Sequence, residues 1–254
     1  LDEHLERLFL SARLLEMEIP VGRDELHETV LESVRRNALS NGAVKIMCYY
    51  PQCAFDLLPP AGNLSTAVFA LDPVRDLEVV FPDCEKGISL CVSGWRKLDP
   101  ASVPTEAKAA ANYLNGMMAA LEGVRRGCDR AVMKDRDGAV AEGGTSSVFI
   151  VKGGRLLTPA PGNILRSITR KSVLSLAESA GVESVEARID MQTCLDADEI
   201  FMSSTLGKVV PVSRFEDRIM PGSKGPVTGR LRERFRAVLS GEDPEFSRWL
   251  FPVG

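Results

Sequence analysis

The sequence predicts a mixed α/β fold divided into two domains, and three observations lead to this prediction. The chain has 254 residues, enough for one large or two ordinary domains with apolar cores. Segments with helical spacing of apolar residues alternate with short apolar runs that end at turn residues. Residues 97–105 contain two prolines and several polar residues, a composition typical of a linker. We therefore expect a small α/β domain over residues 1–100 and a larger domain over residues 106–254.

The N-terminal part is expected to combine helices with a largely antiparallel sheet. Helical spacing covers residues 1–17 and 24–37, with Asp24 as the expected N-cap of the second helix and Asn41-Gly42 as the turn that closes it. Leu1 is not a methionine and lies inside the first predicted helix, so we expect that an N-terminal segment is missing from this sequence. Strands are predicted over 43–50, 65–70, 77–81 and 88–95, with a loop over 52–63.

The C-terminal part begins with a helix predicted over residues 107–126. Two hairpins follow, because Asp137-Gly138 and Gly153-Gly154 each lie between short runs with strand composition. The remaining elements are helices over 167–180 and 227–239 and strands over 182–188, 199–203 and 209–215.

Composition and charge exclude several classes of function. A net charge of −4 gives no reason to expect a nucleic acid or an anionic membrane as partner, and no apolar run reaches the roughly 20 residues of a membrane span. Six cysteines without a CxxC pair favour reduced thiols in the cytoplasm over disulfides or a zinc site. With only two histidines and no HExxH, we expect no metal site, and the GxxxxGK[ST] and GxGxxG nucleotide motifs are absent.

One lysine and one carboxylate indicate where chemistry takes place. Lys108 lies among alanines at the expected start of a helix, where the dipole disfavours a positive charge and small neighbours leave room for a flat ring. A lysine removed from water there can form a Schiff base with a carbonyl. Glu142 is expected at a glycine-rich turn between strands, where a buried anion would keep a pyridine nitrogen protonated. The simpler interpretations are a solvated helix lysine and a carboxylate that caps turn N–H groups.

Two further segments have the composition of an anion site. Ser167-Ile168-Thr169 is expected to begin a helix, whose free N–H groups and hydroxyls attract phosphate. Ser203-Ser204-Thr205 ends a predicted strand with three hydroxyls in a row. Each feature alone is weak, because helix caps and hydroxyl-rich loops occur in most proteins.

Taken in order, these segments resemble the class IV aminotransferases, pyridoxal phosphate (PLP) enzymes of fold type IV. The spacing from Lys108 to Glu142, the Lys-x4-Tyr pattern of Lys108 and Tyr113, and Trp95-Arg96 before the linker most resemble the branched-chain amino acid aminotransferases. The resemblance implies a two-domain fold type IV architecture, PLP as the cofactor, and a homodimer with the active site between the domains. The matching blocks are PTEAKAAANYLN, AVAEGGTSSVF, ILRSITR and EIFMSSTLGKVVPV.

The resemblance also implies a role for each matching residue. Lys108 would be the catalytic lysine that binds the cofactor covalently, with Tyr113 on its ring oxygen and Glu142 on its pyridine nitrogen. Leu165 would pack on the ring face. Nothing in the residues themselves selects Tyr113, which would otherwise be interpreted as a core aromatic. The residues implied for the phosphate are Arg7, Ile168, Thr169, Ser204 and Thr205.

The departures from the family pattern affect the substrate more than the cofactor. Lys45 occupies a strand position where many branched-chain enzymes have an arginine for substrate carboxylates, and a lysine lacks the bidentate fork. Ala43 replaces an aromatic and widens the pocket, and Ser167 replaces a glycine. We expect Lys45, Trp95 and Leu206 to contact the substrate.

These observations predict a PLP-dependent aminotransferase that acts on a branched-chain or other apolar amino acid and a 2-oxo acid, with 2-oxoglutarate as the expected acceptor. Two alternatives keep the cofactor but change the reaction, namely an aminodeoxychorismate lyase and a D-amino acid aminotransferase. Tyr113 and Trp95 argue against both, whereas Lys45 and Ala43 leave them open. A third alternative is a family member that binds PLP without turnover.

Overall fold

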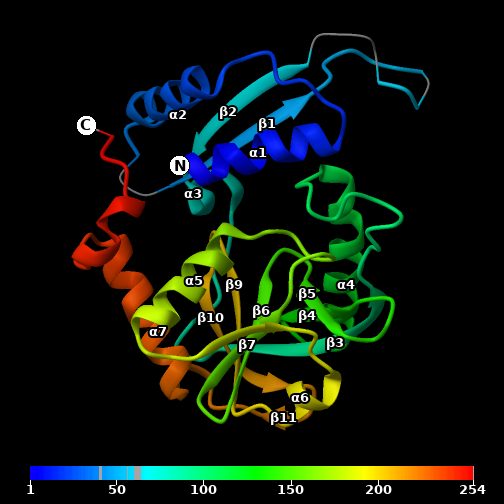
Figure 1. The fold of residues 1–254 in the computed structure, drawn as a ribbon, viewed down its shortest axis with the longest axis vertical. Coiled ribbons are helices and arrows are strands. Elements are labelled where there is room, and N and C mark those ends of the chain that lie inside the picture. The colour runs from blue at the N-terminus through cyan, green and yellow to red at the C-terminus, as the bar shows by residue number, and fades with distance from the viewer. Residues whose placement is uncertain (40–41, 56, 60–63, 254) are drawn as a thin grey trace. The chain divides into compact units, whose positions relative to one another are not determined.

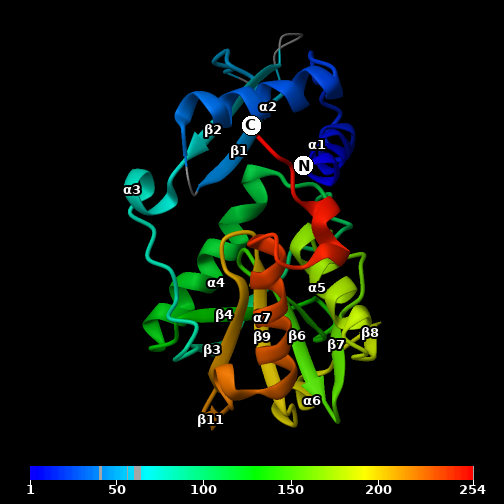
Figure 2. The same cartoon turned by 90° about the vertical axis from the view of Figure 1, so that its left-hand side faces the viewer.

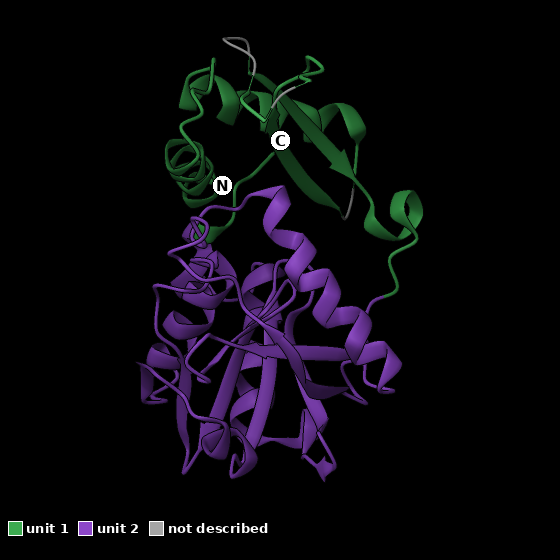
Figure 3. Cartoon of the chain, turned by 90° about the vertical axis from the view of Figure 1, so that its right-hand side faces the viewer, with its two compact units in different colours: residues 1–80, 249–254 green, residues 81–248 purple. Residues whose placement is uncertain are grey.

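The structure, a computed structural model, describes residues 1–39, 42–55, 57–59 and 64–253. The chain groups into two compact units, residues 1–80 with 249–254 and residues 81–248 (Figure 3). The turn predicted at Asn41 and part of the loop predicted over 52–63 lie outside the described residues. The proposed division into folding domains with a linker at 97–105 stays a prediction.

The smaller unit contains the helices and antiparallel strands expected near the N-terminus (Figure 1). Leu26 and Val30 form the buried side of α2, which packs against β2. The N-cap of α2 is Gly22, so the assignment of this role to Asp24 is wrong; Asp24 lies in the first turn, where a negative charge complements the helix dipole. The elements are α1 (Asp2–Leu14), α2 (Arg23–Asn37), β1 (Ala43–Tyr49), β2 (Ser65–Leu71) and α3 (Pro73–Leu77).

The strand predicted over residues 77–81 is wrong, because a short helix, α3, ends at Leu77. Asp72 is its N-cap and accepts hydrogen bonds through Oδ1 from the N–H groups of Val74, at 2.9 Å, and Arg75, at 3.2 Å. Pro73 at the first helical position has its φ angle fixed near the helical value. Glu78, which follows the helix, has a left-handed backbone with φ of +52°, which is incompatible with an extended strand at this position.

Residues 81–248, all of which are described, form a nine-stranded sheet in the order β5-β4-β3-β10-β9-β6-β7-β8, with β11 paired to β10. Strand β3 is parallel to β4 and β10, and β7 is parallel to β8. The two predicted hairpins, β4–β5 and β6–β7, are confirmed. The strands are β3 (Ile88–Arg96), β4 (Arg130–Lys134), β5 (Val140–Gly143), β6 (Ser147–Lys152), β7 (Arg155–Pro159), β8 (Ser184–Ala187), β9 (Glu199–Ser204), β10 (Lys208–Phe215) and β11 (Arg218–Ile219).

Helices cover this sheet on the sides away from its central core. Helix α4 packs on β3 and β4, whereas α5 and α7 pack on β9 and on each other, with α7 also against β10 (Figure 2). Fully buried apolar side chains from β3, β6, β9 and β10 fill the core, among them Leu90, Ile150 and Val212. The helices are α4 (Tyr113–Arg125), α5 (Ile168–Ser179), α6 (Met191–Leu195) and α7 (Pro226–Leu239), with 3₁₀ turns η1 (Ala110–Asn112), η2 (Gly222–Lys224) and η3 (Pro244–Trp249).

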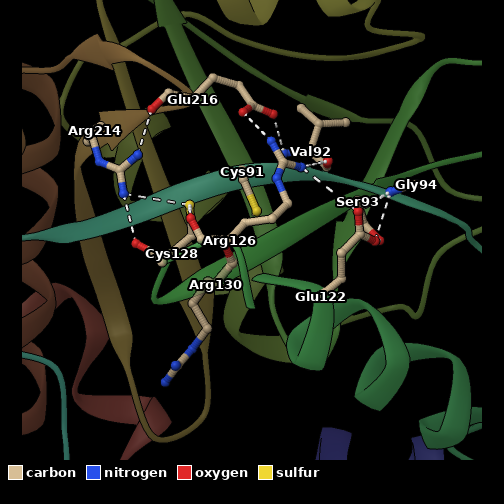
Figure 4. A network of polar contacts seen from close by, with 11 residues as sticks. Cys91, Val92, Ser93, Gly94, Glu122, Arg126, Cys128, Arg130, Arg214 and Glu216 are labelled. Carbon is tan, nitrogen blue, oxygen red and sulfur yellow. Dashed lines mark hydrogen bonds and ion pairs between the residues drawn. The ribbon is translucent and has the colours of Figure 1, made fainter. Parts of the chain in front are cut away.

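A polar network fastens α4 to the sheet (Figure 4). The Glu122 carboxylate accepts a hydrogen bond from the Ser93 hydroxyl at 2.6 Å, and this bond lowers the pKa of Glu122. Arg126 donates to the carbonyl of Val92 and to the carboxylate of Glu216, each at 2.6 Å. Charged donors make these bonds stronger than neutral ones, so the helix is held in a fixed position on β3.

Helix α4 also touches the turn after β5 through a contact between two glycines. A Cβ atom added to Gly116 would lie 2.4 Å from the carbonyl oxygen of Gly144, closer than real Cβ contacts. We predict that Gly116→Ala lowers the free energy of unfolding by about 1–3 kcal/mol, because the added methyl must push the helix from the turn. Urea unfolding of Gly116→Ala and of the control Gly94→Ala, whose Cβ would meet Glu122 at an ordinary 3.5 Å, measures this cost. Equal stability of the two variants would contradict the prediction.

Candidate active site

Lys108 lies in an extended segment just before η1 and α4. The helix predicted over 107–126 therefore begins later than expected, and the placement of Lys108 on its first turn is wrong. The Asn112 side chain donates weak 3.4 Å hydrogen bonds to the carbonyls of Pro104 and Ala107, which hold this segment away from a helical path. The lysine thus owes its position to the chain folding back on itself and not to a helix N-terminus.

The Lys108 side chain is exposed, whereas the sequence predicts one removed from water. Its Nζ atom lies 5.5 Å from the centroid of the Tyr113 ring. Tyr113 is the first residue of α4. Tyr113 is also exposed, which corrects the interpretation of a core aromatic. An amine and a phenol are therefore close together at an exposed position.

Glu142 lies within β5 and is buried. Its Oε1 atom is 2.7 Å from Nζ of Lys97, and the side chains of these two residues are only 9% and 11% exposed. The N–H group of Leu165 donates to the same oxygen at 3.5 Å. Burial raises the pKa of Glu142, and the ammonium group of Lys97 opposes that shift. The expected buried carboxyl group is present, and it has a lysine neighbour that the sequence did not single out.

The N-terminus of α5 lies at the end of the loop that contains Leu165. Ser167 is the N-cap, and its hydroxyl accepts a hydrogen bond from the N–H of Arg170 at 3.2 Å. Ile168 and Thr169 form the first turn, where backbone N–H groups lack helical partners. Arg170 is buried and donates to the carbonyl of Pro159 at 2.6 Å, which ties the helix to the end of β7. The predicted anion site therefore has a rigid support.

The turn between β9 and β10 holds the second hydroxyl-rich segment. The Ser204 hydroxyl accepts a hydrogen bond from the N–H of Gly207 at 3.1 Å. Lys208 has a left-handed backbone with φ of +57°, and its amino group donates to the carbonyl of Thr205. Burial lowers the pKa of Lys208. Leu206, at the tip of the turn, is exposed.

Two serines beside this turn have buried hydroxyls without a hydrogen-bond partner among the described residues. Ser147 of β6 and Ser203 of β9 lie opposite each other in the antiparallel pair. A buried hydroxyl group without a hydrogen-bond partner is energetically costly. The two hydroxyls therefore indicate a position where a polar ligand or a water molecule would supply the hydrogen bonds.

Trp95 lies near the end of β3 and is exposed. Arg7 and Lys45 belong to the smaller unit: Arg7 lies on α1, and Lys45 is exposed on β1, opposite Phe69 of β2. The larger unit by itself brings Lys108 near Tyr113 and joins Glu142 to Leu165. The roles of Arg7 and Lys45 remain proposals.

The family model for amino-transferase class IV matches residues 1–215. The chain belongs to the class IV aminotransferases. Among curated members, the branched-chain-amino-acid aminotransferase of Escherichia coli (strain K12) is 31% identical over 253 residues, which cover 99% of this chain and 82% of that protein. The enzyme of the same name from Pseudomonas aeruginosa is 32% identical over 250 residues, 98% of this chain and 81% of that protein.

Solved structures of class IV aminotransferases have the same fold. The branched-chain aminotransferase of Thermoproteus uzoniensis, solved with norvaline, gives a TM-score of 0.92 at 31% identity and covers 100% of this chain and 84% of that one. The T.th. branched-chain amino acid aminotransferase, solved with pyridoxamine 5'-phosphate, gives 0.91 at 33% identity and covers 99% and 82%. The predicted family, the fold type IV architecture and the predicted class of enzyme, a PLP-dependent transaminase, are confirmed.

The residues of this aminotransferase fit its cofactor, PLP, which has an aldehyde, a ring oxygen, a ring nitrogen and a phosphate. Lys108 offers an amine, Tyr113 a phenol and Glu142 a carboxylate, and a helix N-terminus and a hydroxyl-rich turn supply anion donors. Within the described ranges, no three His, Cys, Asp or Glu side chains could hold a metal ion. Among these residues there is likewise no helix with the length and apolar composition needed to cross a membrane.

The residue that the sequence did not reveal is Lys97. A buried carboxylate requires a cation or hydrogen-bond donors, so the prediction of a buried Glu142 already implied such a partner. The signal was a lysine two positions after the end of the strand predicted over 88–95.

Proposed function

We propose that the enzyme transfers the amino group of a branched-chain L-amino acid to 2-oxoglutarate. The observation that carries this proposal is the exposed Lys108–Tyr113 pair together with the buried carboxylate of Glu142. The names of the similar enzymes support the donor. The T.th. enzyme was also solved with 4-methylvaleric acid and with N-(5'-phosphopyridoxyl)-L-glutamate, which supports an apolar side-chain site and glutamate as the product of the acceptor.

The proposed roles around the cofactor ring follow the chemistry of each side chain. Lys108 would hold PLP through its amine, which can condense with the aldehyde with loss of water, and the phenol of Tyr113 would donate to the ring oxygen. Glu142 would hold the ring nitrogen, because a carboxylate keeps that nitrogen protonated. Leu165 packs on one face of the ring, and its backbone N–H holds Glu142 in place.

The proposed phosphate site is built on two segments of the larger unit. The N–H groups of Ile168 and Thr169 lie at the positive end of α5, a helix of 12 residues. Ser204 and Thr205 add hydroxyls from the end of β9 and the turn that follows. For Arg7 of the smaller unit, a role at the phosphate is proposed from the family resemblance, because a guanidinium group binds phosphate through two parallel hydrogen bonds.

PLP, when bound, withdraws electrons from the carbon atom that carries the amino group, so that this carbon releases its proton. Lys108 would be the base that takes up the proton from the substrate Cα and gives it back during the transfer. The fixed position of α4 on β3 holds Tyr113 in its orientation while Lys108 moves.

The proposed substrate contacts are Lys45, Trp95 and Leu206. Trp95 and Leu206 are exposed apolar side chains of the larger unit, a composition suited to a branched side chain. Lys45 supplies the charge for the carboxylate as a single point, without the two-pronged geometry of arginine. We therefore expect weaker discrimination among 2-oxo acids than an arginine would give.

The enzyme is proposed to be a cytoplasmic homodimer. Helix α4 carries exposed apolar residues at helical spacing, namely Leu114, Met117, Leu121 and Val124, and such a stripe is suited to cover by a second copy. All six cysteines are free, as a reducing compartment requires. We expect light scattering to give twice the mass of one chain for the wild-type enzyme and a lower mass for Leu121→Glu. The control is Ile219→Glu, which places the same charge at an exposed apolar position on β11.

The absorbance spectrum of the PLP-loaded enzyme tests the proposed reaction. L-leucine should shift the visible band of the bound cofactor to shorter wavelength, and 2-oxoglutarate should restore it. A shift with D-alanine alone would indicate the D-specific reaction, and release of pyruvate from aminodeoxychorismate would indicate the lyase. A band that no amino acid changes would indicate a protein that binds the cofactor without turnover and would overturn the proposal.

A further inference from the structure

The buried ion pair between Lys97 and Glu142 has no place in the roles described so far. Its 2.7 Å distance is that of a charge-assisted hydrogen bond, and both side chains are about nine-tenths removed from water. The two contacts found for the carboxylate, from Lys97 and from the N–H of Leu165, both engage Oε1. The other oxygen, Oε2, carries neither of them, so one side of the carboxylate is held while the other is available.

The backbone of Lys97 and of its two neighbours is held by hydrogen bonds, which fix the position of the Lys97 Cα atom. Its own N–H donates to the carbonyl of Lys134 in β4 at 2.8 Å. Asn115 of α4 accepts from the N–H of Leu98 at 3.2 Å and donates to the carbonyl of Arg96 at 2.8 Å. Lys97 is therefore held between β4 and α4 and differs from a long surface lysine that samples many rotamers.

We propose that Lys97 is a positioning residue for the cofactor: its ammonium group holds Oε1 of Glu142, so that Oε2 faces the ring nitrogen of PLP as an ionised carboxylate. This inference rests on the proposed role of Glu142. A buried ion pair contributes little net stability, because desolvation offsets the attraction between the charges. Its main consequence is the orientation and charge of Glu142.

The charged groups that face Glu142 determine how the pair responds to pH. They are the ammonium groups of Lys97 and Lys108; the neutral N–H group of Leu165 adds a hydrogen bond. Burial raises the pKa of Glu142, and the Lys97 ammonium is the largest influence that lowers it. Without Lys97 the carboxylate would take up a proton at higher pH, and a protonated Glu142 cannot stabilise a protonated ring nitrogen.

Titration of the cofactor-free protein with PLP, followed by quenching of tryptophan fluorescence over a range of pH, tests the proposal. Lys97→Met should weaken PLP binding on the order of 10–100-fold, the size of effect seen when an outer partner of a bound group is lost. It should also move the acid-side loss of affinity to higher pH. Lys97→Arg keeps the positive charge and should restore most of the affinity and the original pH profile. The control is Lys152→Met, which removes an exposed lysine paired to Asp196 at 3.5 Å.

A double variant separates an effect that acts through Glu142 from a general loss of structure. In a Glu142→Gln background the carboxylate is gone, so adding Lys97→Met should change PLP affinity by less than about 2-fold, in contrast to its effect in the wild-type background. An unchanged affinity and pH profile in Lys97→Met, in an enzyme whose wild type responds to L-leucine, would overturn this inference alone. A wild type that neither binds PLP nor responds to amino acids would instead overturn the proposed function.

Discussion

The Lys108→Ala variant is expected to lose transamination by at least about 10³-fold, because it lacks both the amine that binds PLP and the base that moves the proton. Its stability should be nearly unchanged, since the side chain is exposed and surface substitutions typically alter the free energy of unfolding by less than about 0.5 kcal/mol. Formation of the 2-oxo acid from L-leucine measures the first effect, and urea unfolding measures the second.

The lysine that binds PLP can also be identified chemically, without an activity measurement. Borohydride makes the bond between lysine and cofactor permanent, and peptide mass spectrometry then locates it. We expect the label on the peptide that contains Lys108, and none in Lys108→Ala. Lys152→Ala serves as the control, because it removes a lysine far along the chain on β6. Labelling of Lys97 in the wild type would show that Lys97, and not Lys108, is the lysine that binds PLP covalently.

Local sequence patterns predicted those parts of the larger unit in which a few adjacent residues decide the backbone. The hairpins follow from Gly138, Gly153 and Gly154, which have φ angles of +87°, +59° and +75° that other residues rarely adopt. The start of α5 follows from Ser167, whose hydroxyl caps the helix. The helical spacing of apolar residues, however, predicted a helix that already includes Lys108, whereas the helical structure begins only at η1.

Features that depend on distant contacts could not be predicted in this way. Strand β3 pairs in parallel with β4 and β10, which lie far from it in the sequence, so local patterns could not select these neighbours. The partner of Glu142 could not be chosen either, because Lys97 and Glu142 are brought together only by the pairing of β3, β4 and β5. The roles of Arg7 and Tyr113 came from family resemblance, since an ordinary helix carries such residues for many reasons.

The Glu142→Gln variant is expected to lose turnover by about 10²–10³-fold while it remains folded. The amide has the size of the carboxylate, and its oxygen still accepts the hydrogen bond from Lys97. The negative charge is lost, and with it the electrostatic stabilisation of the protonated ring nitrogen, an effect of that order for one preorganised group. Steady-state rates with L-leucine and 2-oxoglutarate measure the loss, and a variant with wild-type turnover would remove Glu142 from the mechanism.

The pH dependence of stability gives this variant a second, cofactor-free signature. Because burial raises the pKa of Glu142 in the folded state above its unfolded value, the folded protein binds this proton more tightly. Ionisation of Glu142 therefore costs stability as the pH rises from the unfolded pKa through the raised folded pKa, and above that range the cost is constant. Glu142→Gln has no such titration, so its stability relative to the wild type should rise across the same interval. Urea unfolding at a series of pH values, without PLP, measures the difference, and parallel curves for the two proteins would mean that Lys97 fully offsets the burial of the carboxylate.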